Sequence, residues 1–238
     1  MAILTRKPGG GGGGSVDLSG YLAESLYDAN SVLAADADDA PAALTMGPST
    51  MLARLAAGNI KAASVAEIQA LLGVTVKIGD IDLTATQAFT AIPGTYSDLK
   101  LVLIGRGTQA AATVVANLRF NSDSGTNYES NLINISNNTS ASSATPSQTE
   151  AILSVFPAAS AVANRAGMAI VEIPEYAGGF HKILRSECHT IYDTAASNYV
   201  TQLRGIQWRN TAAITRIDVT LSAGAWAAGS TARLYGTP

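Results

Sequence analysis

From residue 74 to residue 236 the apolar residues come in short runs with a period of two, and this pattern most constrains the fold. Residues 113–121 give the clearest example, because their apolar side chains alternate with polar ones. One face would carry Val114, Ala116, Leu118 and Phe120. No helical pattern interleaves with these runs. The sequence therefore predicts a mainly β protein whose body is an antiparallel, jelly-roll-like β-sandwich.

Further strands are predicted along the same stretch, and turn-forming clusters separate them. They lie at residues 98–105, 151–156, 168–173, 180–190, 199–208, 215–221 and 230–234. Residues 98–105 are apolar on both faces after Lys100, which predicts a central strand covered on both sides.

Residues 134–148 are polar apart from Ile135 and alanines, and they predict a long exposed loop. Long loops on a rigid sandwich are common binding sites. The candidate contact residues are Asn137, Asn138, Thr139, Ser140 and Ser142.

The chain divides by composition into three segments, residues 1–15, 16–73 and 74–238. The first contains a run of glycines at 9–14, which favours a flexible arm that becomes ordered only against a partner. Its candidate attachment residues are Ile3, Leu4, Arg6 and Lys7. The alternative is an untethered tail.

The second segment predicts a short, partly helical shaft. A helix is expected at residues 19–30 and a strand at residues 42–46. Ser64 and Glu67 form a capping-box pattern for a second helix, which Gly73 would end. Neither helix is long enough to bury its apolar face alone, so we expect identical copies to wrap around one another.

The chain is weakly charged, with 14% charged residues and a net charge of -3. Ordinary soluble domains carry about 25%. A surface of this kind is solubilised by Ser, Thr, Asn and Gly, or is partly hidden in an assembly. The sequence contains no basic patch that would predict nucleic acid as a partner. No apolar run is long enough for a spanning helix, and no apolar signal-peptide region is present, so we expect synthesis in a cytoplasm without signal-dependent export.

Two groups of residues resemble segments of known proteins. The first group is residues 28–33 (DANSVL), 41–45 (PAALT), 49–54 (STMLAR), 58–60 (GNI) and 67–73 (EIQALLG). It is similar to a segment that recurs in tailed-bacteriophage fibre proteins. The second group is residues 96–99 (YSDL), 118–128 (LRFNSDSGTNY) and 228–236 (AGSTARLYG). It is similar to the β-rich tips of phage fibres and related virion proteins. The resemblance implies a trimer attached to the virion by its N-terminus, with an outward β tip.

Metal and cysteine chemistry have few candidates. Asp28, Asp36, Asp38 and Asp39 offer oxygen ligands for calcium, but the EF-hand pattern is absent and a solvated loop is the alternative. His181 and His189 would lie about 26 Å apart on one strand. Around a trimer axis, three copies of one histidine could hold an ion. Cys188, the single cysteine, excludes an internal disulfide and would face away from His189.

Other residues could serve an enzyme or a ligand site. Glu172, Glu175 and Asp193 are the carboxylates that would suit a glycan-cleaving tailspike. Residues 105–108 (GRGT) lack the helix of a phosphate loop and predict a turn that ends a strand. Trp208 and Trp226 could stack on sugars, and packing in the core or an interface is the alternative.

These patterns together predict a non-enzymatic virion protein without a cofactor: a homotrimeric phage tail fibre that binds a glycan or protein on the host surface. It would attach to other virion proteins through residues 1–15. The alternatives are a head fibre or capsid decoration, and a small glycan-cleaving tailspike.

Overall fold

The computed structural model describes residues 31–37, 40–55, 60–85, 87–193 and 199–238. It divides into two compact units, Met1–Leu71 and Leu72–Pro238. The attachment residues Ile3, Leu4, Arg6 and Lys7 and the helix expected at 19–30 lie outside the described residues. So do Asp28, Asp38 and Asp39 of the acidic cluster. No helix in the described ranges is long and apolar enough to cross a membrane.

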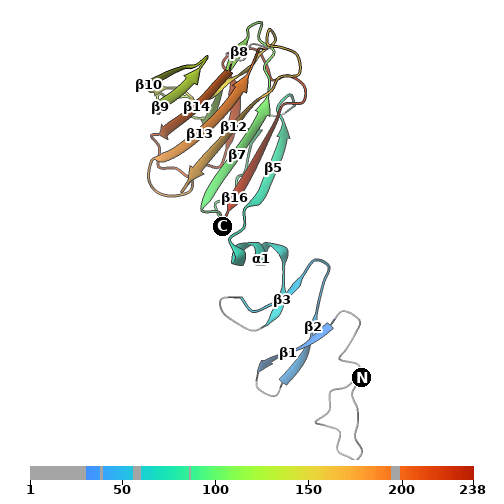
Figure 1. Cartoon of the computed structure of the whole chain (residues 1–238). Coiled ribbons are helices and arrows are strands. Elements are labelled where there is room, and N and C mark those ends of the chain that lie inside the picture. The colour runs from blue at the N-terminus through green and yellow to red at the C-terminus, as the bar shows by residue number, and fades with distance from the viewer. Residues whose placement is uncertain (1–30, 38–39, 56–59, 86, 194–198) are drawn as a thin grey trace, which may run out of the picture. The chain divides into compact units, whose positions relative to one another are not determined.

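The first unit holds two small antiparallel ribbons and one helix (Figure 1). Strand β1 (Ser31–Ala37) pairs with β2 (Ala40–Thr45), which confirms the strand expected near 42–46. Strand β3 (Met51–Ala53) pairs with β4 (Lys61–Ala63). Helix α1 (Val65–Leu72) follows directly.

The capping box of α1 is confirmed. The backbone N–H of Glu67 donates to Ser64 Oγ at 3.3 Å, and the backbone N–H of Ser64 donates to the Glu67 carboxylate at 2.9 Å. Gly73 ends the helix with a φ of 62°, a left-handed conformation that favours glycine. No side chain of α1 is buried. On its apolar face, Val65 and Leu71 are exposed and Ile68 is partly buried.

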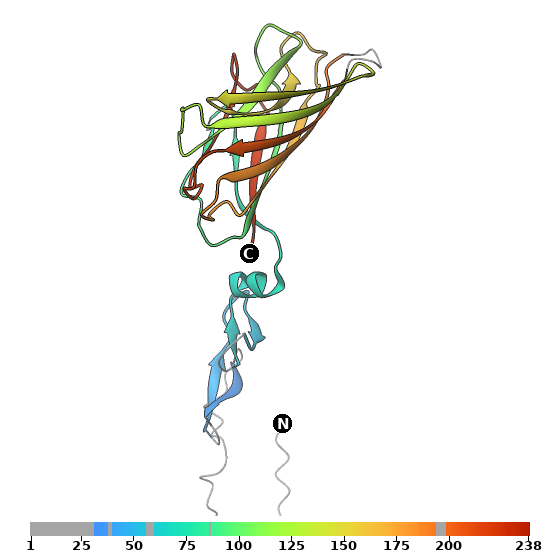
Figure 2. The ribbon, with the colours of Figure 1, turned by 90° about the vertical axis from the view of Figure 1, so that its left-hand side faces the viewer.

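The second unit is a β-sandwich of two antiparallel sheets, which confirms the predicted fold class. The large sheet has the order β10-β9-β14-β13-β12-β7-β16-β5, visible in Figure 1, and Figure 2 views it from its β10 side. Its strands, in chain order, are β5 (Val76–Asp82), β7 (Asp98–Gly105), β9 (Tyr128–Ser136), β10 (Thr139–Gln148), β12 (Gly167–Pro174), β13 (Lys182–Ile191), β14 (Tyr199–Trp208) and β16 (Thr231–Thr237).

The small sheet packs on the inner face of the large one, with the order β11-β8-β15-β6. Its strands are β6 (Ala88–Phe89), β8 (Thr113–Phe120), β11 (Ala151–Pro157) and β15 (Ile217–Leu221). The apolar side chains predicted to share one face of residues 113–121 are all buried, which confirms that alternation. They are Val114, Ala116, Leu118 and Phe120.

The core between the sheets contains both tryptophans, which are buried. The Trp208 ring lies 5.5 Å from Phe120 and 6.3 Å from Tyr128 between centroids. Trp226 meets Phe156 edge-on at 5.4 Å. The alternative in which these indoles stack on sugars is therefore wrong for the folded unit.

Two predictions about strands need correction. Residues 134–148 are not a loop: they belong to the β9–β10 hairpin, whose two-residue turn is Asn137-Asn138, with φ of 51° and 62°. The alternation was hidden because β10 is an edge strand with little apolar surface to bury. Strand β7 is central in its sheet but covered on one face only, so that Ile104 on the outer face is exposed.

The two ends of the second unit differ in their connection to the rest of the chain. The chain enters this unit at Val76, which pairs with Gly236, and the next residue, Thr237, pairs with Asp98 at the start of β7. Lys182, the first residue of β13, pairs with Trp208 at the same end of the sheet. The β12–β13 turn therefore also lies at this end. We call it the entry end. The opposite end, the far end, carries the β9–β10 turn and the Ile191–Tyr199 pair.

Candidate binding surfaces

A cluster of tyrosine and asparagine side chains lies at the far end of the second unit. We define the tyrosine–asparagine cluster as Asn137, Asn138, Tyr192 and Tyr199. Tyr199 Oη donates to Asn138 Oδ1 at 2.8 Å, and Tyr192 Oη donates to Asn137 Oδ1 at 3.4 Å. The backbone N–H of Asn137 donates to the Tyr199 carbonyl at 3.2 Å. The hairpin turn is thus hydrogen-bonded to Tyr192 and Tyr199, which flank the β13–β14 connection.

The sequence prediction located part of this cluster. The contact residues expected there are Asn137, Asn138, Thr139, Ser140 and Ser142, and all are exposed, the first two in the turn and the rest on β10. Tyr192 and Tyr199 were missed because they lie more than fifty residues away. The one available signal was that the two tyrosines lie on either side of the stretch between two predicted strands.

The cluster suits recognition of polar surfaces. Tyrosine offers a rigid ring and a hydroxyl at small conformational cost, and asparagine offers a donor and an acceptor in one group. Both asparagines are exposed and the two tyrosines are partly exposed. The cluster can therefore bind sugar or protein groups by hydrogen bonds and ring contacts.

The outer face of the large sheet carries two rows of mostly apolar side chains, which we call the outer apolar rows. Cross-strand register defines them from β9 to β7. The first is Ile135, Thr201, His189, Met168 and Ile104, and the second is Ile133, Leu203, Glu187, Ile170 and Val102. At the usual strand spacing each row extends about 19 Å. An exposed apolar band of this width is typical of an interaction surface.

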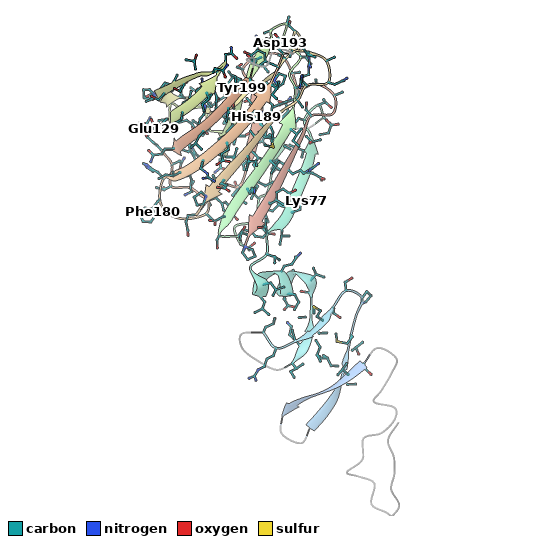
Figure 3. The ribbon with its side chains drawn as sticks, viewed as in Figure 1. Lys77, Glu129, Phe180, His189, Asp193 and Tyr199 are labelled. Atoms are coloured by element: carbon teal, nitrogen blue, oxygen red, sulfur yellow. The ribbon has the colours of Figure 1, made fainter. Side chains whose placement is uncertain are left out.

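A shallow hollow of about 330 Å³ lies on this face. Its lining includes Ile135, Met168, His189 and Leu203. The imidazole Nδ1 of His189 lies 2.9 Å from Thr201 Oγ1, which fixes the ring in the middle of the sheet (Figure 3). The hollow is mostly apolar, so it suits packing against another surface.

The histidines and the cysteine do not form a site together. His189 is exposed on the outer face, whereas Cys188 is buried on the inner face, as the alternation predicted. His181 lies just before β13 begins. Burial raises the pKa of the Cys188 thiol. Among the described residues, no group of three His, Cys, Asp or Glu side chains is arranged to hold a metal ion.

The three candidate carboxylates lie apart. Glu172 accepts from Arg185 at 2.9 Å on the exposed outer face. Glu175 is in the β12–β13 turn at the entry end, where its backbone N–H donates to Asp98 Oδ1 at 3.1 Å. Asp193 is at the far end (Figure 3). The structure therefore does not bring Asp193 together with the two glutamates.

Arg106, just after β7, links the β7–β8 connection to the β11–β12 connection. Its guanidinium donates to the carbonyls of Val162 and Ala161, both at 2.6 Å, and to that of Ala159 at 3.1 Å. Strand β7 ends at Gly105, as predicted, but residues 105–108 do not form a turn, because Gly107 makes an antiparallel bridge with Trp226.

Comparison with known proteins gives no relative for this chain: no family model, curated protein or solved structure matches it.

Proposed function

We propose that this chain is a bacteriophage virion protein, a homotrimeric tail fibre that is attached by residues 1–15 and binds a host-surface glycan or protein through the second unit. Neither catalysis nor a cofactor forms part of this proposal. The observation that carries it is the tyrosine–asparagine cluster at the far end. This end is opposite the point where the preceding chain enters, so a unit held from its N-terminal side presents the cluster outward.

The outer apolar rows support the assembly part of the proposal. Side chains such as Ile133 and Leu203 are exposed in one chain, and their burial against further copies would be favourable by about 25 cal/mol per Å². The weak overall charge fits this interpretation, because interface centres are depleted of charged residues. Three copies would also present three far ends, and several weak contacts add up through avidity.

The binding role is tested by competition. Purified chain should block adsorption of the phage to host cells, and Tyr199→Ala and Asn138→Ala should each weaken this block by about tenfold, as expected for loss of one central contact. Phe180→Ala is the matched control, because Phe180 is an aromatic residue with 88% exposure at the entry end. Equal loss from the control and the cluster variants would contradict the cluster's role.

The assembly role is tested by light scattering. The wild-type chain should run as a trimer, and Leu203→Asp should dissociate it while far-ultraviolet circular dichroism stays unchanged. Ser222→Asp, in an exposed position of the β15–β16 connection, is the control and should remain trimeric. A stable folded wild-type monomer would overturn this part of the proposal.

Location on the virion is tested by immunogold labelling with antibody against residues 90–238. Gold at the tail supports receptor binding, whereas gold over the head would indicate a head fibre or decoration protein. Release of reducing ends from host polysaccharide by purified chain would instead indicate a tailspike enzyme and overturn the non-enzymatic proposal.

A further inference from the structure

The inner face of the large sheet buries an arginine for which the described residues supply no counter-ion. Arg204 lies in the middle of β14 and is 8% exposed. Its cross-strand neighbours on the same face are Ser186 on β13 and Leu132 on β9. Ser130, one row closer to the entry end on β9, is the diagonal neighbour of Arg204. Direct neighbours of this kind have Cβ atoms about 4.5–5.5 Å apart, and diagonal ones about 7–8 Å.

These three side chains hold hydrogen-bonding atoms that no protein group satisfies. Arg204 Nε, Ser130 Oγ and Ser186 Oγ are all buried without a partner in the described ranges, whereas the two terminal nitrogens of Arg204 are not among such buried atoms. The described part of the chain also places no carboxylate within ion-pair distance of Arg204.

Two other cations of the same unit have protein partners, whereas none is found for Arg204 among the described residues. Lys182 is buried at the entry end, where its Nζ donates to the carbonyls of Gly178, Phe180 (2.7 Å) and Thr211 (3.2 Å). Arg119, which is only partly buried, pairs with Glu150 at 2.6 Å. A buried charge that is neither paired nor hydrogen-bonded costs several kcal/mol, so native structures rarely retain one.

Two properties of the chain could reduce the cost of burying the Arg204 charge: a lowered pKa of the guanidinium and a nearby counter-ion. Burial lowers the pKa of its guanidinium, but arginine remains protonated in proteins, so the charge persists. The adjacent Cys188 is a poor counter-ion, because burial raises the pKa of its thiol and favours the neutral form. Neither property therefore neutralises the guanidinium, which leaves water or a ligand from outside the chain to meet its donors.

We propose that Arg204, Ser130 and Ser186 form a binding site for a small oxyanion such as phosphate or a carboxylate. The planar guanidinium presents two parallel N–H donors that match two oxygens of such a group, and the two hydroxyls supply further donors. This site lies on the opposite face of the sheet from the outer apolar rows. It is independent of the tyrosine–asparagine cluster and of the proposed function.

The test is thermal unfolding of the full chain titrated with sodium phosphate and, separately, sodium acetate, against sodium chloride at matched ionic strength. Phosphate or acetate at about ten times its dissociation constant should raise the wild-type Tm by about 3–6 °C above the chloride control. Arg204→Met should abolish this rise. Arg233→Met is the matched control, because Arg233 is exposed on the outer side of β16, and it should keep the full rise.

Arg204→Lys is the second variant, in case the methionine variant does not fold. This variant keeps the charge but loses the planar pair of N–H donors, so the rise in Tm should fall to less than half of the wild-type value. Equal responses of wild type, Arg204→Lys and Arg233→Met would show a non-specific ion effect and overturn the proposal. A wild-type chain that responds no more to phosphate or acetate than to chloride would overturn it as well.

Discussion

The two faces of the large sheet are built from the same strands but differ in what covers them. On the inner face, Trp208, Leu101 and Val171 are buried under the small sheet. On the outer face, Leu203, Met168 and Ile104 are similarly apolar and yet exposed. Hydrophobic content alone therefore does not identify the core of this unit. The apolar side chains of the inner face are covered within the chain, whereas the outer apolar rows stay exposed and are available to further copies.

The strongest test of this difference between the two faces is to truncate one residue on each face of β14. Trp208→Ala on the inner face should lower the free energy of unfolding by about 3–5 kcal/mol, because it leaves a cavity among Phe120 and Tyr128. Leu203→Ala on the outer face should change it by less than about 1 kcal/mol when measured on dissociated chain. Urea unfolding gives both values, and similar losses would mean that the faces do not differ.

A smaller effect should come from the carboxylate that holds the inner-face indole. Trp208 Nε1 donates to Asp123 Oδ2 at 2.7 Å, and the backbone N–H of Gly125 donates to Asp123 Oδ1 at 2.9 Å. Burial raises the pKa of Asp123, but the hydrogen bonds from Trp208, Asn127 and Gly125 outweigh it, so the net pKa is lowered. Asp123→Asn should therefore cost about 1–2 kcal/mol at pH 7, measured by urea unfolding.

The direction of the lowered pKa of Asp123 fixes the pH dependence of this contribution. The folded chain binds the proton less readily than the unfolded chain, so the stabilisation is present above the ordinary value of 3.8. It should be lost as the pH falls below that value. The difference between wild type and Asp123→Asn should shrink in the same range, and a constant difference from pH 7 to pH 2 would contradict the assignment.

The smallest effect is expected at helix α1, which resembles the outer face in having no buried side chain. Hydrogen bonds from Lys61 and from the backbone and hydroxyl of Ser64 lower the pKa of Glu67 to about 2. The cap is therefore favoured above the ordinary value of 4.5 and is lost as the pH falls through about 2. Carboxyl NMR titration should find this value in wild type and a value near 4.5 in the Lys61→Ala, Ser64→Ala double variant.

Some elements could be predicted because their signal is local. The capping box of Ser64 and Glu67 needs four consecutive residues, and β14 matches the predicted strand at 199–208 in full. The β9–β10 hairpin could not be found in this way. Its outer residues Ile133 and Ile135 alternate with polar ones, but β10 as an edge strand contributes almost no apolar signal.

The sequence by itself determined that the chain is mainly β, where most strands lie, and that Asn137 and Asn138 are exposed, because alternation and turn residues act over a few positions. Only the tertiary structure decided which face of each strand is covered, since Ile104 and Leu103 are equally apolar in sequence. It also brought Tyr199 to Asn138 and left Arg204 Nε buried without a partner among the described residues. These outcomes depend on pairing between strands far apart in the chain, and no local pattern encodes that register.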